Sequence, residues 1–368
     1  MKLLFVCRKF DRVVGGVERM AVTLMNAMCE RGHQVSLLTW DRANAEPYYP
    51  MDSRIRWHCL DMGDPMVVAG WGLRLARMAR IRSLAAWERP DVVIAFQHGP
   101  FMTVRLAVLG LGLPVIAAER NAPSRFDHTR AGRHRKLLFQ TFRLAAKVTV
   151  QLESYKDDYP AYLRPRIVTI PNPVQPAAAF ATPSGRPGGP KTLLTVGRLS
   201  YQKNQEVLVR AFARLATDFP DWRLRIVGDG EDHAKLERLV GELGIASRVD
   251  LAGPVRDVSA EYVAAHLFCL PSLWEGFPNA LAEALTHGLP AVGFRGCSGV
   301  NELIRPGENG LLVDDDVDDG ALSKALRSLM LDGQVRATLG REATKISEDD
   351  APDGIFARWQ YLFESVTR

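Results

Sequence analysis

The chain has 368 residues, 47% hydrophobic and 24% charged, which is typical of a soluble globular protein of about two domains. No apolar stretch approaches the roughly 18 residues of a membrane-spanning helix, so only peripheral membrane contact is expected. Residues 1–172 carry 26 Lys and Arg against 15 Asp and Glu, whereas residues 173–368 carry 21 against 27. This asymmetry predicts that the basic half faces an anionic partner, with lipid headgroups favoured and nucleic acid not expected.

The five cysteines are scattered and lack any Cys-x-x-Cys spacing, which argues against both a disulfide framework and a zinc site. No metal is expected. Residues 1–6 are apolar but too short for an export signal, so they are interpreted as a first strand. We therefore expect a cytoplasmic location.

In the first half, strands are predicted at 2–7, 34–39, 91–96, 114–118 and 147–150, with helices at 17–31 and 71–87. Strands that alternate with helices predict βαβ units and a parallel sheet. Gly15 and Gly16 precede the first helix, where they either let a phosphate or sugar approach the backbone or form a plain turn. The Gly-x-Gly-x-x-Gly fingerprint is absent there, which disfavours a nicotinamide-dependent dehydrogenase.

Polar residues follow two of these predicted strands, at positions where α/β sheets bind ligands. Glu119, Arg120 and Asn121 follow the strand at 114–118, and His98 follows the strand at 91–96. We interpret Glu119, Arg120 and Asn121 as candidate ligand contacts. His98 is interpreted as a loop or supporting residue.

Residues 125–147 form a basic amphipathic segment with seven Lys or Arg, one acid and several large apolar residues. Such a segment binds an anionic membrane surface, or else forms a solvated helix face. The residues assigned to ligand or membrane contact are Gly15, Arg120, Asn121, Arg130, Arg133, Arg135 and Lys136.

Residues 175–190 are rich in Ala, Pro and Gly and predict a linker. The expected domains are therefore 1–174 and 191–347, followed by an aromatic amphipathic helix within 348–368. Strands of the second domain are predicted at 192–196, 222–227, 249–251, 263–271, 291–294 and 310–313.

The stretch 270–290 predicts a ligand site in the second domain. A buried strand leads into a polar loop with Glu275, and a helix then starts at Asn279, the expected N-cap, with Glu283 one turn inside. Free N–H groups at a helix start favour a phosphate, while the two carboxylates can accept hydrogen bonds from sugar or ribose hydroxyls. The alternative is that Glu283 stabilises the helix dipole and that Glu275 is solvated.

Two cations precede the next predicted helix and can reach the same phosphate. Arg198 and Lys203 lie five residues apart in the loop after the strand at 192–196. The acids at 314–316 and 318–319 lack the spaced ligands of a calcium or magnesium site, so we interpret them as exposed loop and helix-start residues.

Glu275 and Glu283, separated by seven residues, resemble the signature of the retaining glycosyltransferases of family 4. Other matches follow in the family's order, namely Gly15-Gly16, residues 196–199 with Lys203-Asn204, residues 227–231 and residues 251–253. The resemblance implies the GT-B fold, an α/β architecture with two Rossmann-like domains whose parallel sheets face a central cleft. It also implies that the C-terminal helix crosses back to the first domain.

The resemblance implies a metal-independent, retaining transfer of a hexose or N-acetylhexosamine from a nucleoside diphosphate sugar to a glycan hydroxyl. A UDP sugar is favoured over GDP-mannose, the acceptor is polyprenyl- or lipid-linked, and no cofactor is needed. The enzyme would lie peripherally on the inner face of the cytoplasmic membrane.

In such enzymes Arg198 and Lys203 would bind the diphosphate and stabilise the leaving group, Glu275 would bind the hexose hydroxyls and Glu283 the ribose. Glu119 would contact the acceptor hydroxyl or stabilise the reacting centre, with Gly15, Arg120 and Asn121 as further acceptor contacts. Many relatives have His where Arg120 stands, so no His role is carried over to that position. The implied donor-binding set is Gly16, Gly197, Arg198, Lys203, Gly228, Val255, Arg256, Glu275, Gly276, Phe277, Asn279, Ala280 and Glu283.

Two rival functions stay open at this stage. One is a GT-B phosphorylase, which needs a pyridoxal lysine, or a nucleotide-sugar epimerase. The other is a two-lobed sugar-binding protein without catalysis, a class that is usually exported.

Overall fold

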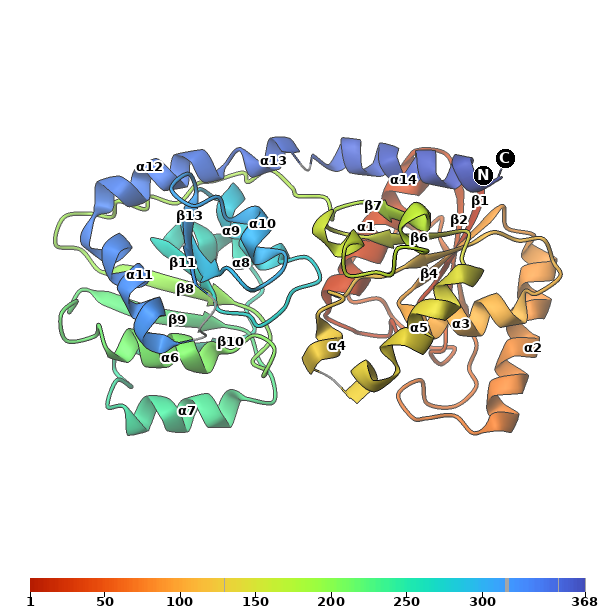
Figure 1. Ribbon diagram of the computed structural model, residues 1–368, viewed down its shortest axis with the longest axis horizontal. Helices are drawn as coiled ribbons and strands as arrows, with labels where there is room; N and C mark the ends of the chain where they lie inside the picture. The colour runs from red at the N-terminus through yellow and green to blue at the C-terminus, as the bar shows by residue number, and fades with distance from the viewer. Residues whose placement is uncertain (129, 315–317, 350, 368) are drawn as a thin grey trace. The chain divides into compact units, whose positions relative to one another are not determined.

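The computed structural model describes residues 1–128, 130–314, 318–349 and 351–367. The chain divides into two compact units (Figure 1). Unit 1 comprises Met1–Asn172 and Asp353–Arg368, and unit 2 comprises Pro173–Pro352. The chain therefore leaves unit 1 after Asn172 and comes back to it near its end.

The described residues of unit 1 form one seven-stranded sheet in the order β3-β2-β1-β4-β5-β6-β7, with every neighbouring pair parallel. The order reverses between β1 and β4, and doubly wound sheets bind ligands at the carboxyl ends of the strands beside such a reversal. The strands are β1 Lys2–Val6, β2 Gln34–Thr39, β3 Arg56–Cys59, β4 Val92–Phe96, β5 Val115–Ala118, β6 Lys147–Val150 and β7 Ile167–Thr169.

Helices connect these strands, and one further helix comes from the end of the chain. The α-helices are α1 Gly16–Glu30, α2 Trp71–Glu88, α3 His98–Ala107, α4 Arg125–His128, α5 Arg135–Thr141 and α14 Pro352–Thr367. Single 3₁₀ turns are η1 Arg130–His134, η2 Phe142–Leu144, η3 Ser154–Lys156 and η4 Arg164–Arg166.

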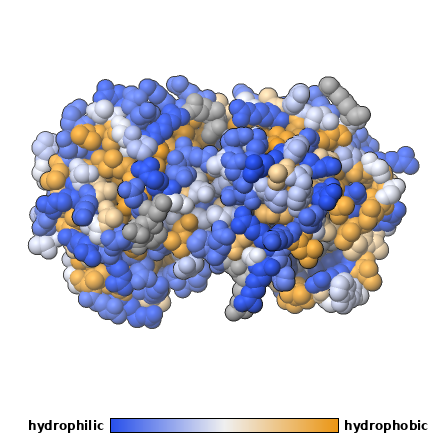
Figure 2. Space-filling view, viewed as in Figure 1, coloured by the Kyte–Doolittle hydropathy of each residue, from blue (hydrophilic) through white to orange (hydrophobic). Residues whose placement is uncertain are grey.

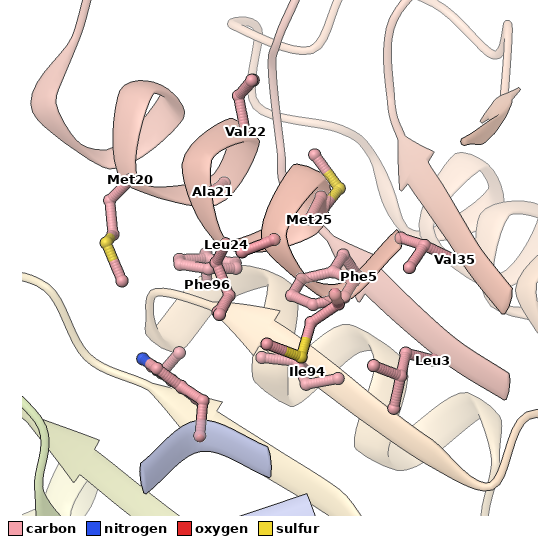
Figure 3. Close-up of a cluster of buried hydrophobic side chains, with 14 of the residues drawn as sticks. Leu3, Phe5, Met20, Ala21, Val22, Leu24, Met25, Val35, Ile94 and Phe96 are labelled. Atoms are coloured by element: carbon pink, nitrogen blue, oxygen red, sulfur yellow. The ribbon is translucent and has the colours of Figure 1, made fainter. Parts of the chain in front are cut away.

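The core of unit 1 joins the first and last helices of the chain. Leu24 of α1 lies beside the sheet residue Phe96 (Figure 3), and Met25 and Phe5 belong to the same buried cluster. From α14, Trp359 and Phe363 are fully buried in the same cluster, and the Phe363 ring meets Phe5 edge-on with centroids 6.5 Å apart. The expected return of the C-terminal helix to the first domain is thus confirmed.

The described residues of unit 2 form a six-stranded sheet in the order β10-β9-β8-β11-β12-β13, again with parallel neighbours. Here the order reverses between β8 and β11. The strands are β8 Lys191–Val196, β9 Trp222–Val227, β10 Val249–Gly253, β11 Leu267–Leu270, β12 Ala291–Phe294 and β13 Gly310–Val313. The helices are α6 Gln205–Ala213, α7 His233–Glu242, α8 Val258–Ala264, α9 Asn279–Thr286, α10 Val300–Leu303, α11 Asp319–Leu331, α12 Gly333–Ala343 and α13 Ile346–Asp349. The predicted class, two α/β units each built on a parallel sheet, is confirmed.

Part of the stretch expected as a linker is held on unit 2. The Ala181 N–H donates to the His287 carbonyl at 2.8 Å, and the buried Arg336 guanidinium donates to the carbonyls of Pro183 and Ser184. These bonds fix residues 181–184 against the second unit.

The basic segment at 125–147 is divided among the short helices α4, η1, α5 and η2 and the start of β6. A Cβ at Gly132 would lie 2.0 Å from the Phe126 carbonyl oxygen, so the chain folds back on itself there.

Of the acids at 314–319, Asp318 caps α11 through the Ala321 N–H, Asp314 pairs with Arg295, and residues 315–317 lie outside the described part.

No helix in the parts of the chain that the structure describes is long and apolar enough to cross a membrane.

Candidate functional site

The loops after β8 and β11 lie together at the point where the strand order of unit 2 reverses. The two strands are paired neighbours, so residues 197–204 and 271–278 leave the same sheet edge. The Leu273 N–H donates to the Gln202 carbonyl at 2.8 Å, and the Gln202 side chain donates to the Trp274 carbonyl at 2.8 Å. These bonds make the two loops one structural unit at a position typical of ligand sites.

An ion pair lies at the junction of the two loops. Lys203 Nζ is 2.6 Å from Glu275 Oε1, and the Ser272 hydroxyl donates to the same oxygen at 2.6 Å. The Glu275 side chain is only 5% exposed and that of Lys203 19%. Because a buried carboxylate is costly without a cation or hydrogen-bond donors, the pair holds both side chains in place. The sequence predicted that both residues bind one ligand, but it did not predict that they contact each other.

Arg198 is the second cation expected at this place, and its side chain is exposed. Its backbone carbonyl accepts a hydrogen bond from Gln205 Nε2 at 2.9 Å, while its guanidinium makes no hydrogen bond or ion pair among the described residues. Nearby, Asn204 Nδ2 is buried and has no hydrogen-bond partner in the described structure. Cationic and N–H donors thus remain available beside the Lys203–Glu275 pair.

Helix α9 supplies the other half of this site. It begins at Asn279, and Pro278 occupies the N-cap, so the expectation that Asn279 is the N-cap was wrong by one residue. Proline tolerates this place because a helix start leaves N–H groups without partners in any case. Gly276, Phe277 and Ala280 lie in or beside this turn.

Glu283 lies one turn into α9 and is positioned by a neighbouring helix. The Tyr262 hydroxyl, from α8, donates to Glu283 Oε2 at 3.0 Å. Tyr262 is itself buried and its ring packs near His287, whose Nε2 lies 2.6 Å from the Ser259 hydroxyl. Tyr262 therefore holds the Glu283 carboxylate in place, and Glu283 as a whole is half-exposed.

The Gly228–Gly230 turn supports the loop that carries Arg198. The Leu199 N–H donates to the Asp229 carbonyl at 3.0 Å. A Cβ at Gly228 would lie 2.1 Å from the Gly197 carbonyl oxygen, and one at Gly230 would lie 2.2 Å from the Leu199 carbonyl oxygen. No side chain fits at either position, so these glycines have a packing role beneath the loop.

Val255 and Arg256 follow β10, two strands away from β8, and Arg256 is exposed. The Gly253 carbonyl just before them accepts the Gly228 N–H at 2.9 Å. The two residues therefore lie on the sheet edge that also carries the Lys203–Glu275 pair.

In unit 1, Gly15 is the N-cap of α1 and Gly16 its first residue. A Cβ at Gly15 would lie 2.2 Å from Glu18 Oε2, but that atom ends a flexible side chain and the backbone of Gly15 is extended, so the position does not require glycine. The pair lies in the connection from β1 to α1, on one side of the reversal in strand order.

Glu119 is a buried carboxylate at the end of β5. It lies 3.8 Å from the Arg125 guanidinium, while its Oε1 atom has no hydrogen-bond partner among the described residues. Burial raises the pKa of Glu119, and the neighbouring Arg125 and Arg120 oppose that rise. A half-satisfied carboxylate of this kind is typical of a functional group rather than of a purely structural one.

The expectation that Arg120 contacts an acceptor is not supported by its surroundings. Its guanidinium is buried, donates to Thr149 Oγ1 at 2.8 Å and to the Ile170 carbonyl at 3.3 Å, and stacks over the Trp359 ring at 5.1 Å. Burial lowers the pKa of Arg120 to about 9. The side chain thus joins β6 and the end of β7 to α14, whereas Asn121 beside it is half-exposed.

His98 begins α3 and supports the same region from inside. Its Nε2 lies 2.8 Å from Thr141 Oγ1, and its ring meets Phe142 edge-on. Burial and then the nearby Arg125 lower the pKa of His98 to about 4. The imidazole is therefore neutral near pH 7, which agrees with the supporting role expected for it.

The basic residues of the 125–147 segment differ in exposure and in their contacts with other side chains. Arg135 pairs with Asp127 at 3.3 Å and lies over the Phe139 ring, whereas Arg133 and Lys136 are exposed. The Arg130 side chain lies outside the described part of the structure. Among the side chains that the structure describes, no three His, Cys, Asp or Glu residues gather as a metal site.

Comparison with known families matches almost the whole chain. Residues 14–178 match the family described as Glycosyltransferase Family 4, and residues 178–346 match the family described as Glycosyl transferases group 1. The two matches meet near the boundary between units 1 and 2.

Two curated relatives cover the full chain at modest identity. An exopolysaccharide phosphotransferase of Streptomyces coelicolor is 28% identical, but the chain spans only 41% of its length. A Campylobacter jejuni enzyme, 27% identical over 100% of this chain and 99% of its own, is named as an α-1,4-N-acetyl-D-galactosaminyltransferase that acts on a diNAcBac-PP-undecaprenol-linked glycan.

A solved structure has the same fold. HepE of Anabaena, in complex with UDP, superposes with a TM-score of 0.78 at 18% identity and covers 99% of this chain and 100% of its own.

Proposed function

Because the chain belongs to the family 4 glycosyltransferases of the GT-B fold, we propose that it transfers a hexose or N-acetylhexosamine from a UDP sugar to a glycan hydroxyl. The proposal includes retention of the anomeric configuration and independence from metal ions. The carrying observation is the Lys203–Glu275 pair, which joins the loops after β8 and β11 at the reversal of strand order in the unit 2 sheet.

The donor diphosphate would bind against these two loops. An ammonium group has three N–H donors, so Lys203 can keep its bond to Glu275 while it binds a phosphate oxygen. The exposed Arg198 and the N–H groups at the start of α9 would meet the remaining negative charge. Glu275 would accept hydrogen bonds from hexose hydroxyls, and Glu283, held by Tyr262, from the ribose.

The leaving group is where negative charge develops during transfer. In the proposed reaction the acceptor hydroxyl attacks from the face that the diphosphate leaves, and a phosphate oxygen takes its proton. Groups that stabilise such developing charge from fixed positions are each worth a few kcal/mol in enzymes. The interlocked loops would provide that fixed position for Lys203 and Arg198.

On the acceptor side, we propose that Glu119 contacts the incoming hydroxyl, because its Oε1 atom has no partner among the described residues. A UDP donor is favoured by the UDP complex of HepE. The undecaprenol-linked substrate in the name of the Campylobacter relative favours a lipid-linked glycan acceptor, and with it a peripheral place on the inner face of the cytoplasmic membrane.

A donor assay with matched variants tests the proposal. The chain is incubated with a lipid-linked glycan acceptor and UDP, GDP or ADP sugars, with and without EDTA, and both nucleotide release and the anomeric configuration of the glycosylated acceptor are measured. We expect release of UDP, retained configuration and no loss of rate with EDTA. Inversion would contradict the retaining mechanism, an EDTA-sensitive rate would contradict metal independence, and a preference for GDP-mannose would contradict the UDP donor.

The control variant removes an ion pair of the same kind from the opposite edge of the same sheet. Lys191 Nζ lies 2.5 Å from Asp221 Oδ2 at the amino end of β8. Lys191→Met with Asp221→Asn should keep transfer, whereas Lys203→Met with Glu275→Gln should lose it by at least about 100-fold. Equal activity of both double variants would remove the assignment of the site.

A further inference from the structure

Unit 1 exposes a group of large apolar side chains around the start of α2 and the loop before it. Val68 is 78% exposed and Trp71 80%, and Met66, Val67 and Leu75 are also exposed. Isolated exposed apolar residues are common on protein surfaces, but a contiguous group of this kind marks an interaction site. We call these five residues, together with Trp87, the α2 patch.

One buried and two exposed arginines hold the loop in place. Arg8 donates to the Pro65 carbonyl at 2.7 Å, and Arg77, from the buried face of α2, donates to the Met62 carbonyl at 2.6 Å. At the loop's other end, Arg74 donates to the Ala69 carbonyl at 2.8 Å and lies over the Trp71 ring. The backbone on both sides of residues 66–68 is thus fixed while their side chains face solvent.

Helix α2 continues the same surface. Its buried positions are Arg77, Ile81, Ala85 and Glu88, which recur on one face. The opposite face carries exposed alanines, and Trp71 and Trp87 flank that face on its two sides, about 24 Å apart along the helix axis. In Figure 2, hydrophobic atoms are visible at the side of unit 1 on which Figure 1 draws α2.

Charge decides which partner fits this surface. Residues 66–87 contain four arginines and no acid, and Arg74, Arg80 and Arg82 are exposed. Tryptophan prefers the boundary between lipid headgroups and hydrocarbon, and arginine on a flanking face attracts anionic lipids. An exposed apolar group that lies beside arginines and has no acid near it in the sequence is therefore suited to the surface of an anionic bilayer.

We propose that the α2 patch docks unit 1 on an anionic membrane, with residues 66–68 and Trp71 in the headgroup region and α2 parallel to the surface. This deepens the proposed function, because it names the surface that would bring the enzyme to a lipid-linked acceptor. It also differs from the sequence expectation, which placed membrane contact in the segment 125–147.

The test measures co-sedimentation of the full chain with vesicles of phosphatidylglycerol and phosphatidylethanolamine, and with vesicles of phosphatidylcholine alone. We expect binding to the anionic vesicles, and a loss of affinity of at least about tenfold in Val67→Ser with Val68→Ser, because apolar area is removed. Arg80→Gln should weaken binding to anionic vesicles only. All of these side chains are exposed, so the thermal midpoint should not change.

Matched controls separate this surface from others. Leu331, in unit 2, is also exposed, and Leu331→Ser should bind vesicles like the unaltered chain. Leu137→Ser alters an exposed residue of the 125–147 segment. The proposal is overturned if Leu137→Ser loses binding while Val67→Ser with Val68→Ser does not, or if none of the proteins binds.

A partner other than lipid gives a different result. If the patch joins two copies of the chain, sedimentation without lipid would show a dimer that Val67→Ser with Val68→Ser dissociates, and this outcome also overturns the proposal. Vesicle binding needs no sugar donor. Failure to release UDP from any donor would thus contradict the proposed function, but vesicle binding by the α2 patch would be decided by the sedimentation experiment alone.

Discussion

At the scale of single residues, the pairing of Lys203 with Glu275 gives each side chain two tasks. The Glu275 side chain is only 5% exposed, and its bond to Lys203 supplies the partner that a buried carboxylate needs. The same two residues are those proposed to hold the donor. Replacing one partner therefore changes stability as well as chemistry, because it leaves the other charge buried and uncompensated.

We predict that Lys203→Ala lowers the free energy of unfolding by about 3 kcal/mol. Adding Glu275→Gln to it should recover much of this stability, because no buried charge is left, but should not recover transfer. Urea unfolding curves and donor turnover, measured on the two single variants and the double variant, give both quantities. Additive losses of stability in the double variant would show that the pair is not coupled.

His98 predicts how stability depends on pH. Its pKa of about 4 lies below the ordinary 6.5, so its protonation opposes folding. The stability that the neutral imidazole contributes is present above about pH 6.5 and is lost as the pH falls toward 4. His266, in unit 2, also has a pKa lowered to about 4 and acts in the same range.

We therefore expect His98→Gln to flatten, but not abolish, the fall in unfolding free energy between pH 6.5 and pH 4. After allowance for the partial exposure of His98, the difference should be about 2 kcal/mol. Urea unfolding at several pH values measures it. An unchanged pH profile would mean that His98 already titrates normally in the folded protein.

At the scale of elements, the turn after β9 determines the shape of the loop after β8. Gly228→Ala would place a Cβ 2.1 Å from the Gly197 carbonyl oxygen, at a backbone φ of 133° that alanine rarely adopts. We predict a stability loss of about 2 kcal/mol and weaker donor binding, because the loop that carries Arg198 must move.

Gly241→Ala is the matched control for that turn. Gly241 lies inside α7, and no atom lies within 4 Å of the Cβ it would gain. Alanine there should raise stability by about 0.5–1 kcal/mol and leave donor binding unchanged. Thermal unfolding with and without UDP compares the two variants, and equal behaviour would contradict a packing role for Gly228.

Sequence reasoning worked best where a pattern is local to one element. The periodicity of α1 and the apolar run of β4 located these elements to within one residue, whereas the strand predicted at 263–271 was wrong at its start, because α8 continues to Ala264 and β11 is only Leu267–Leu270. The order of strands and helices also predicted two parallel sheets, because parallel neighbours need crossover helices.

Contacts between distant segments were beyond the sequence. Lys203 and Glu275 are 72 positions apart, and only the pairing of β8 with β11 brings them together. Arg120 resembled a surface residue because arginine seldom lies buried, yet Trp359, more than 200 positions away, covers it. A charged residue next to a strand end can thus face either a ligand or the core.

At the scale of the whole molecule, the chain end belongs to the first unit. Trp359 is fully buried in the core of unit 1, whereas Tyr361, two residues later on the same helix, is exposed. We predict that Trp359→Ala lowers the stability of unit 1 by about 3–5 kcal/mol, through the cavity it leaves. Tyr361→Ala should have little effect.

Calorimetry of the full chain tests this assignment. The transition of unit 1 should move to lower temperature in Trp359→Ala, while the transition of unit 2 and its stabilisation by UDP should persist, because the proposed donor contacts belong to residues 173–352. Loss of UDP binding in this variant would argue that the donor site is not complete within unit 2.

The central claim is that the loops joined by Lys203 and Glu275 bind the diphosphate of the donor. Calorimetric titration of UDP tests it most directly, with the Lys203→Met, Glu275→Gln double variant beside the Lys191→Met, Asp221→Asn control. We predict that the unaltered chain and the control bind UDP alike, and that the site variant binds about 10–100-fold more weakly. Equal affinity in all three proteins, or no affinity for UDP in the unaltered chain, would contradict the claim.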